Sequence, residues 1–164
     1  MNAPPSLRIV RAELSDAAHA AAFVALLDHY ARDPMGGGQG LSQTVRAELV
    51  PRLRARLDFV AFLAFDEERP VGLVNCFEGF STFAARPLLN VHDIVVLGEY
   101  RGRGVGQALL GAAEAEARAR DCCKLTLEVL SNNRAALAAY ARAGFRPYEL
   151  DPPAGQALFL QKWM

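Results

Sequence analysis

The sequence predicts one domain of mixed α/β class over residues 1–164, and three observations support this prediction. Strand-like and helix-like runs alternate along the chain, which is typical of sheet and helix layers around one core. Residues 88–96, 107–120 and 124–129 form a strand–helix–strand unit, and such units are normally parallel and right-handed. The chain has the length of one domain, and its sequence contains neither an internal repeat nor a linker.

The first predicted elements are a strand, a helix and a loop. Residues 7–12 alternate between apolar and polar side chains, as in a half-buried strand. An alanine-rich helix follows as far as Tyr30, and Ser15 or Asp16 can cap it because each has a side-chain oxygen for a first-turn N–H. Residues 31–40 contain four glycines and a proline, which predicts a loop.

A second helix and a hairpin are predicted next. The helix runs from Ser42 to Arg56 and is expected to break or bend at Pro51, because proline has no N–H to donate. Residues 59–65 and 71–80 are apolar runs with the length of strands. The polar and proline-containing residues 66–70 between them predict a hairpin.

The remaining elements follow the same alternation. Residues 88–96 form the predicted central strand, and residues 124–129 form the strand after the crossover helix. Asn133 is expected to cap the last main helix, and Gly144 to end it in the left-handed conformation. Residues 156–163 are predicted to form a closing strand.

The turn between the central strand and the crossover helix predicts an anion site. Its three alternate glycines leave the backbone N–H groups uncovered, and the following helix begins with N–H groups that have no intrahelical partner. The positive end of the helix dipole favours a phosphate or pyrophosphate there. The turn consists of Arg101, Gly102, Arg103, Gly104, Val105 and Gly106, and its two arginines add positive charge.

Three interpretations of this turn compete. A P-loop needs Lys and Ser or Thr after the last glycine, whereas Gln107 and Ala108 stand there. A dinucleotide-binding turn needs G-x-G-x-x-G spacing, which differs from the G-x-G-x-G found here, although Glu128 resembles the ribose-binding acid of such proteins. A turn that serves only helix packing also remains open.

The sequence downstream of the turn favours a different interpretation from these three. Arg101, Gly104 and Gly106 match the R/Q-x-x-G-x-G/A signature of the GNAT superfamily of N-acetyltransferases, and residues 127–145 resemble the second conserved block of that superfamily. The resemblance covers residues 88–145 closely and is architectural before them. It implies a central, mostly antiparallel mixed sheet with a splayed parallel strand pair and flanking helices. It also implies acetyl-CoA as cofactor and an amine as acceptor.

The resemblance further implies which residues hold the cofactor. Backbone groups of Ile94 and Val96 would pair with the pantetheine arm, and the N–H of Val95 or Val96 would stabilise the developing oxyanion. The amides of the turn at residues 101–106 would bind the pyrophosphate. Asn133 and Tyr140 would complete the cofactor site.

The predicted chemistry needs proton transfer rather than a covalent nucleophile, because an acyl thioester is already electrophilic. Tyr140 is the candidate acid for the departing thiolate, with a core aromatic as the structural alternative. The candidate bases are Glu128, Asp93 and His92; Glu128 has the spacing from Tyr140 that is seen in acetyltransferases of ribosomal-protein N-termini. A role of Glu128 in fixing its loop and a water chain without a single base remain open.

Composition and residue spacing argue against several kinds of partner, cellular location and cofactor. Eighteen basic and eighteen acidic residues balance, so the charge favours neither nucleic acid nor an anionic membrane as partner. The N-terminus lacks signal-peptide features, and the longest apolar run, residues 59–65, is too short to span a bilayer. We therefore expect a cytoplasmic protein. The three cysteines and three histidines have no metal-ligand spacing, so no metal is predicted, and Cys76, Cys122 and Cys123 are expected to be small buried hydrophobes.

The acceptor is left open by the sequence. Residues 28–35 and the connector at residues 80–86 are expected to line its pocket, and the acceptor is the amine of a small molecule or a peptide. A homodimer through the final strand is possible in this interpretation. A CoA-binding module without turnover and, less favoured, a dinucleotide-binding domain remain the alternative functions.

Overall fold

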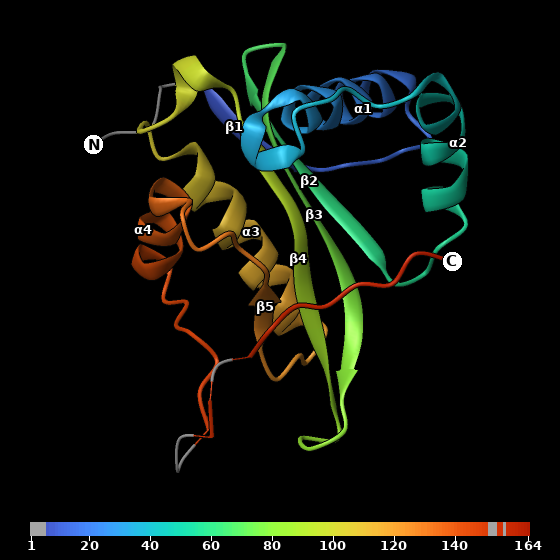
Figure 1. Ribbon diagram of the computed structural model, residues 1–164. Coiled ribbons are helices and arrows are strands. Elements are labelled where there is room, and N and C mark those ends of the chain that lie inside the picture. Colours follow the sequence, from blue (N-terminus) through green and yellow to red (C-terminus); the bar gives the residue numbers. More distant parts are fainter. Residues whose placement is uncertain (1–5, 151–153, 156) are drawn as a thin grey trace. The chain divides into compact units, whose positions relative to one another are not determined.

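The structure is a computed structural model that describes residues 6–150, 154–155 and 157–164 (Figure 1). The chain divides into two units, one ending at Leu127 and the other beginning at Glu128. The first unit contains a five-stranded sheet in the order β1-β2-β3-β4-β5. The strands are β1 (Leu7–Arg11), β2 (Phe59–Asp66), β3 (Arg69–Ser81), β4 (Arg86–Val96) and β5 (Leu125–Leu127).

The pairing of these strands confirms the predicted mixed sheet. Neighbours from β1 to β4 are antiparallel, whereas β4 and β5 are parallel and are joined by a crossover helix. The helices of the first unit are α1 (Ala17–Arg32), α2 (Gln43–Arg54) and α3 (Val105–Ala119), with short 3₁₀ turns η1 (Pro34–Gly36) and η2 (Gly98–Tyr100). In Figure 1, α1 and α2 lie on one side of the sheet and α3 on the other.

Each face of the sheet has its own apolar contacts. On the α1 side, Phe23 and Leu26 belong to a buried cluster with Leu63, Leu73 and Val95 of the strands. On the α3 side, the absence of a side chain at Gly72 allows the helix to approach: a Cβ there would lie 3.0 Å from Leu109 and 3.2 Å from Val105. Both layers therefore pack directly on the strands that carry the candidate site.

Local chemistry sets the start of the first helix, whereas core packing accompanies the continuation of the second. Asp16 caps α1 by accepting the N–H groups of Ala18 and His19, as predicted. The predicted break at Pro51 is wrong, because α2 continues through it to Arg54. Proline removes only one donor near the end of a helix, and Leu53, in the last turn, is held in the core.

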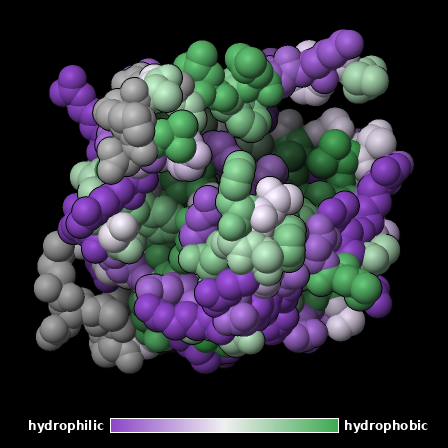
Figure 2. All heavy atoms as spheres, turned by 90° about the horizontal axis from the view of Figure 1, so that it is seen from below, coloured by the Kyte–Doolittle hydropathy of each residue, from purple (hydrophilic) through white to green (hydrophobic). Residues whose placement is uncertain are grey.

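The hairpins are longer and tighter than the sequence indicates. Asp66 pairs with Arg69, so only two residues form the first turn, and Glu67 adopts a positive φ of 53° there. The second hairpin joins Ser81 to Arg86. Residues 82–85 form its turn, so the connector expected to line a pocket is the end of this hairpin. Figure 2 views the molecule from the side on which this second hairpin projects and shows mixed polar and apolar side chains on that face.

The second unit contains α4 (Arg134–Arg142), whose ends are as predicted. Asn133 accepts the N–H of Ala136 at 3.2 Å, and Gly144 has a φ of 89°. The predicted closing strand is wrong for residues 157–163, which have no strand pairing, while Gln156 lies outside the described residues. Large apolar side chains of this segment are 78–86% exposed, and an extended run without a ladder partner is not a stable strand: Leu158, Phe159, Leu160, Trp163.

Across the described part of the chain, no helix combines the length and the apolar character needed to cross a bilayer. Cys76 is fully buried in β3, and burial raises the pKa of its thiol to about 12. This confirms Cys76 as a small core residue without thiolate chemistry. Cys122 and Cys123 are half-buried, so their predicted burial is only partial.

Candidate functional site

The glycine turn at the start of α3 has the geometry of an anion cradle. Gly102 and Gly104 have φ values of 75° and 85°, a region that residues with a Cβ adopt only with strain. Gly104 is the N-cap residue and has no side chain to satisfy the helix. The first helical hydrogen bond runs from the N–H of Ala108 to the Gly104 carbonyl at 3.0 Å, so the helix ladder leaves the N–H groups of Val105 and Gly106 to an external acceptor.

The third glycine has a different role from the first two. Gly106 is already helical, and a Cβ there would meet Val96 at 3.8 Å, an ordinary contact. The sequence analysis treated the three glycines alike, whereas only Gly102 and Gly104 adopt the left-handed conformation that favours glycine.

The two arginines of the turn are held by neighbouring groups. Arg101 donates from Nε to the Val96 carbonyl at 3.1 Å, and its other nitrogen lies 3.3 Å from the Asp33 carboxylate. Arg103 lies with its guanidinium 5.4 Å from the centre of the Tyr100 ring. Arg101 thus reaches back to the strand and to the loop after α1, while Arg103 stays beside the turn.

Strand β4 has an open backbone edge next to this turn. Strand β5 pairs only with residues Leu89 to Val91, so in the first unit the rest of β4 is paired on the β3 side alone. This is the splay of the parallel pair that the sequence resemblance implies.

The direction of the β4 backbone follows from its neighbours. The N–H of Leu97 donates to Val71 on β3, and the Val95 carbonyl lies 3.1 Å from the Cβ position of Gly72 on β3. Because backbone groups alternate along a strand, Ile94 and Val96 present theirs to the open edge. The backbone groups of Val95 point toward β3, so its N–H is not free to stabilise an oxyanion. Of the two candidate donors, the N–H of Val96 is left.

A β-bulge in β4 brings two predicted residues to the same face. Asn75 pairs with Asp93 and Cys76 pairs with Val91, so His92 is an extra residue without a partner in the register. The His92 ring packs edge-on against Phe77 at 5.3 Å. The Asp93 carboxylate accepts a hydrogen bond from Asn75 at 2.9 Å.

The end of α1 faces this bulge. Burial raises the pKa of the Tyr30 phenol, and the negative charges of Asp93 and Asp33 raise it further. Tyr30 therefore stays protonated at neutral pH and can donate a hydrogen bond beside the carboxylates. The N–H of Met35 is the main reason that the pKa of Asp33 is lowered, so Asp33 stays ionised at neutral pH.

Sequence reasoning missed the bulge and Asn75. The available signal was a single amide in the otherwise apolar middle of β3, where a polar group needs a partner. Its partner is known only once the register of β3 against β4 is known.

The candidates in the second unit have local contacts of their own. The Tyr140 ring lies 6.0 Å from the Phe145 ring, and the Phe145 N–H donates to the Tyr140 carbonyl at 3.0 Å. Glu128 follows the end of β5 at Leu127, so the strand alternation that predicted the face of its side chain does not reach it. The roles of Glu128, Asn133 and Tyr140 stay predictions from the resemblance.

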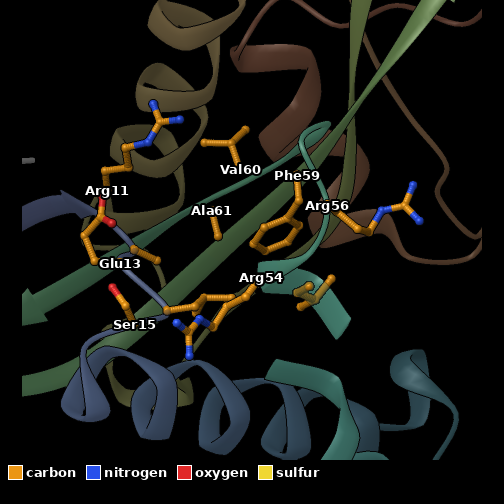
Figure 3. Close-up of a pocket in the computed structure, with 11 residues that line it drawn as sticks. Arg11, Glu13, Ser15, Arg54, Arg56, Phe59, Val60 and Ala61 are labelled. Atoms are coloured by element: carbon orange, nitrogen blue, oxygen red, sulfur yellow. The ribbon is translucent and has the colours of Figure 1, made fainter. Parts of the chain in front are cut away.

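A separate cavity of about 270 Å³ contains none of the predicted site residues. It lies between the end of β1, the start of β2 and the residues around the end of α2 (Figure 3). The side chains of Arg11 and Arg56 extend away from each other there, toward salt bridges with Glu116 at 2.7 Å and Asp58 at 2.6 Å. Those arginines are therefore neutralised locally and do not form an anion site. Among the described residues no His, Cys, Asp or Glu cluster could hold a metal ion.

Comparison with known proteins agrees with this geometry. The model of the acetyltransferase (GNAT) family matches residues 22–145, a span that includes the bulge, the glycine turn and α4. The chain belongs to the GNAT family. Its fold is also that of a crystal structure described as a probable acetyltransferase, with a TM-score of 0.78 and 26% identity over 95% of this chain and 99% of that one.

Curated relatives match over a shorter range. N-alpha-acetyltransferase MAK3 of Arabidopsis thaliana is 35% identical over 86 residues, which are 52% of this chain and 44% of that protein. An uncharacterized N-acetyltransferase of Methanocaldococcus jannaschii is 35% identical over 83 residues, 50% of this chain and 37% of the relative. The matched region therefore spans less than half the length of either relative.

Proposed function

We propose that this chain is an acetyl-CoA-dependent N-acetyltransferase, which transfers an acetyl group to a primary amine of a small molecule or peptide by direct attack. The observation that carries the proposal is the turn with two left-handed glycines at the start of α3, next to the open edge of β4, in a member of the GNAT family. The family match continues across the boundary at Leu127, which supports treating residues 1–164 as one acetyltransferase domain.

The residues present fit CoA. The N–H groups at Val105 and Gly106 and the left-handed glycines before them suit a pyrophosphate, because a side chain at either glycine would strain the turn. The backbone groups of Ile94 and the N–H of Val96 suit an arm that contains amides, while the Val96 carbonyl already accepts a hydrogen bond from Arg101. The turn as a whole, Arg101, Gly102, Arg103, Gly104, Val105 and Gly106, would hold the phosphates. Acetyl-CoA supplies an acyl thioester that an uncharged amine can attack without help from a covalent nucleophile.

The chain's own task is then to move protons and stabilise charge. His92 and Asp93, presented together by the bulge, are candidates to accept the proton of the acceptor ammonium, directly or through water. The Val96 N–H on the open edge is the donor for the developing oxyanion. Tyr140 is the proposed acid for the thiolate, Glu128 is the rival base, and Asn133 holds the start of the helix that carries Tyr140.

For the acceptor we favour the terminal amine of a peptide. The name N-alpha-acetyltransferase of one relative supports this class, and the carboxylates of Asp33 and Asp93 near the Tyr30 phenol would attract an ammonium group. A small cationic amine has the same attraction to these carboxylates and is the second candidate. A cytoplasmic location and a homodimer are further predictions, to be checked by cell fractionation and by light scattering.

Two measurements test the proposal. Titration calorimetry should show binding of CoA and acetyl-CoA and no binding of NADH; tight NADH binding without CoA binding would support the dinucleotide alternative. Release of the CoA thiol should then be followed with a thiol-reactive dye across peptides, polyamines, amino acids and aminoglycosides. CoA binding without thiol release from any amine would show a binding module and refute the proposed transfer.

A further inference from the structure

Asn75 combines polarity with deep burial. Its side chain is 3% exposed in the middle of β3, between Val74 and Cys76, which are both fully buried. A buried amide without hydrogen bonds is costly, so a partner is required at this position. The Asn75 side chain forms two hydrogen bonds with Asp93, at 2.9 Å and 3.1 Å.

These two hydrogen bonds have different functions. The Asp93 N–H donates to Asn75 Oδ1, so the side chain provides an acceptor for a backbone donor at the point where the register of β4 shifts. Asn75 Nδ2 donates to Asp93 Oδ2, which fixes the direction of that carboxylate and leaves Oδ1 available to another group. One side chain thus closes the bulge and orients the residue that follows it.

The bulge has a consequence for the reactive face. In a regular strand, His92 and Asp93 would point to opposite faces, because side chains alternate. Here His92 packs on Phe77, and Asp93 pairs with Asn75 close enough to Tyr30 of α1 for its charge to act on the phenol. His92 and Asp93, the two candidate bases of β4, are consequently both on its α1 side.

We infer that Asn75 is a positioning residue for acetyl transfer: it holds the β4 bulge and aims the Asp93 carboxylate at the acceptor amine. This inference rests on the proposed function. If Asn75 had only a structural role, the protein would need a hydrogen-bonded amide and carboxylate at these two positions. It would then not matter which of the two residues carries the carboxylate.

The two roles are separated by exchanging the two side chains. Asn75→Asp keeps an acceptor for the Asp93 N–H but removes the donor to the carboxylate and places two negative charges together. The double variant Asn75→Asp with Asp93→Asn restores a complementary pair, because the new amide can donate to the new carboxylate. In this double variant the carboxylate is on residue 75, at the buried position on β3, and no longer on residue 93 of β4.

The assay is acetyl transfer to the best amine from the screen, with kcat and KM measured for both substrates, together with thermal unfolding. Asn75→Asp should lower kcat/KM for the acceptor about a hundredfold, as expected for a misplaced reacting group, while the KM for acetyl-CoA is unchanged. Asn75→Ser, which is small and uncharged, should show the same split if the aspartate variant does not fold. The exchanged pair should regain most of the lost Tm and stay as inactive as Asp93→Asn alone.

Asn90→Asp is the matched control. Asn90 is an amide on β4 whose Nδ2 donates to Thr126 at 3.1 Å, so this variant also charges an inter-strand amide but leaves Asp93 untouched. Recovery of turnover in the exchanged pair, or equal loss in the Asn75 and Asn90 variants, would overturn the inference and leave the acetyltransferase proposal standing. A wild-type protein that releases no CoA thiol with any amine would overturn both.

Discussion

Replacing Gly104 by alanine tests the cradle at the start of α3. Gly104 is the N-cap residue, with a φ of 85°, and an added Cβ would meet nothing within 4 Å. The substitution therefore costs only the backbone strain of a left-handed alanine, about 1–2 kcal/mol. If the turn relaxes to avoid this strain, the N–H groups of Val105 and Gly106 lose their common direction.

A matched glycine in the same helix predicts the opposite sign for stability. Gly111 lies within α3, has no positive φ, and also has open space around its Cβ position. Gly111→Ala should raise the free energy of unfolding by about 0.5–1 kcal/mol, because alanine is the better helix former. Gly104→Ala should lower it by about 1–2 kcal/mol.

The assays are chemical denaturation and calorimetric titration with CoA. Gly104→Ala should weaken the CoA Kd by about tenfold, the equivalent of about 1.4 kcal/mol, whereas Gly111→Ala should leave it unchanged. A Gly104→Ala protein that is destabilised but binds CoA like the wild type would refute the assignment of this turn to the pyrophosphate. Stabilisation by both substitutions would refute the strain argument itself.

Three further predictions concern chemistry and pH. Tyr140→Phe should lower kcat by about a hundredfold or more at an unchanged acetyl-CoA affinity if the phenol protonates the thiolate, whereas a core role predicts a lower Tm and an intact rate per folded molecule. Among Glu128→Gln, Asp93→Asn and His92→Ala, the variant of the true base should lose the acidic limb of the pH–rate profile; retention of that limb in all three would assign it to the amine or a water relay. The pKa of Asp28 is lowered chiefly by its hydrogen bond to Arg32, so its stabilising effect is present above the unfolded pKa of about 4 and is lost as pH falls through the lower folded value. The Tm gap between the wild type and Asp28→Asn should therefore be open at pH near 7 and close in acid; a gap independent of pH would contradict this.

The elements that carry clear side-chain signals could be predicted from the sequence. Asn133 caps the helix that the sequence assigned to it, and Asp16, one of two candidates, caps the first helix. Ser42, where the second helix was predicted to start, is its N-cap. A cap depends only on one side chain and the next few N–H groups. The parallel pairing of β4 and β5 followed from the crossover helix between them.

Features that depend on a partner could not be predicted from the sequence. The run at residues 157–163 has the composition of a strand, but a strand also needs a neighbour, and none pairs with these residues in the structure. The helix through Pro51 shows the converse case, since core packing of Leu53 preserves an element that local propensity would end.

The same contrast between side-chain signals and partner-dependent features applies to the candidate site. The residue pattern of the turn located its glycines, whereas His92 and Asp93 were predicted from the family resemblance. Side-chain patterns carry no information on which backbone edge lacks a partner, so Val95 and Val96 were equivalent candidates until the contacts with Val71 and Gly72 showed that Val95 faces β3. Predicting the bulge requires both the side-chain pattern and the strand pairing. The sequence shows Asn75 as a lone amide among apolar neighbours, but its pairing with Asp93 follows only from a register shift of one residue. In this chain the site proposed for acetyl-CoA is therefore built mostly from backbone groups. The site proposed for the amine is built from a few side chains, whose directions depend on the β4 bulge.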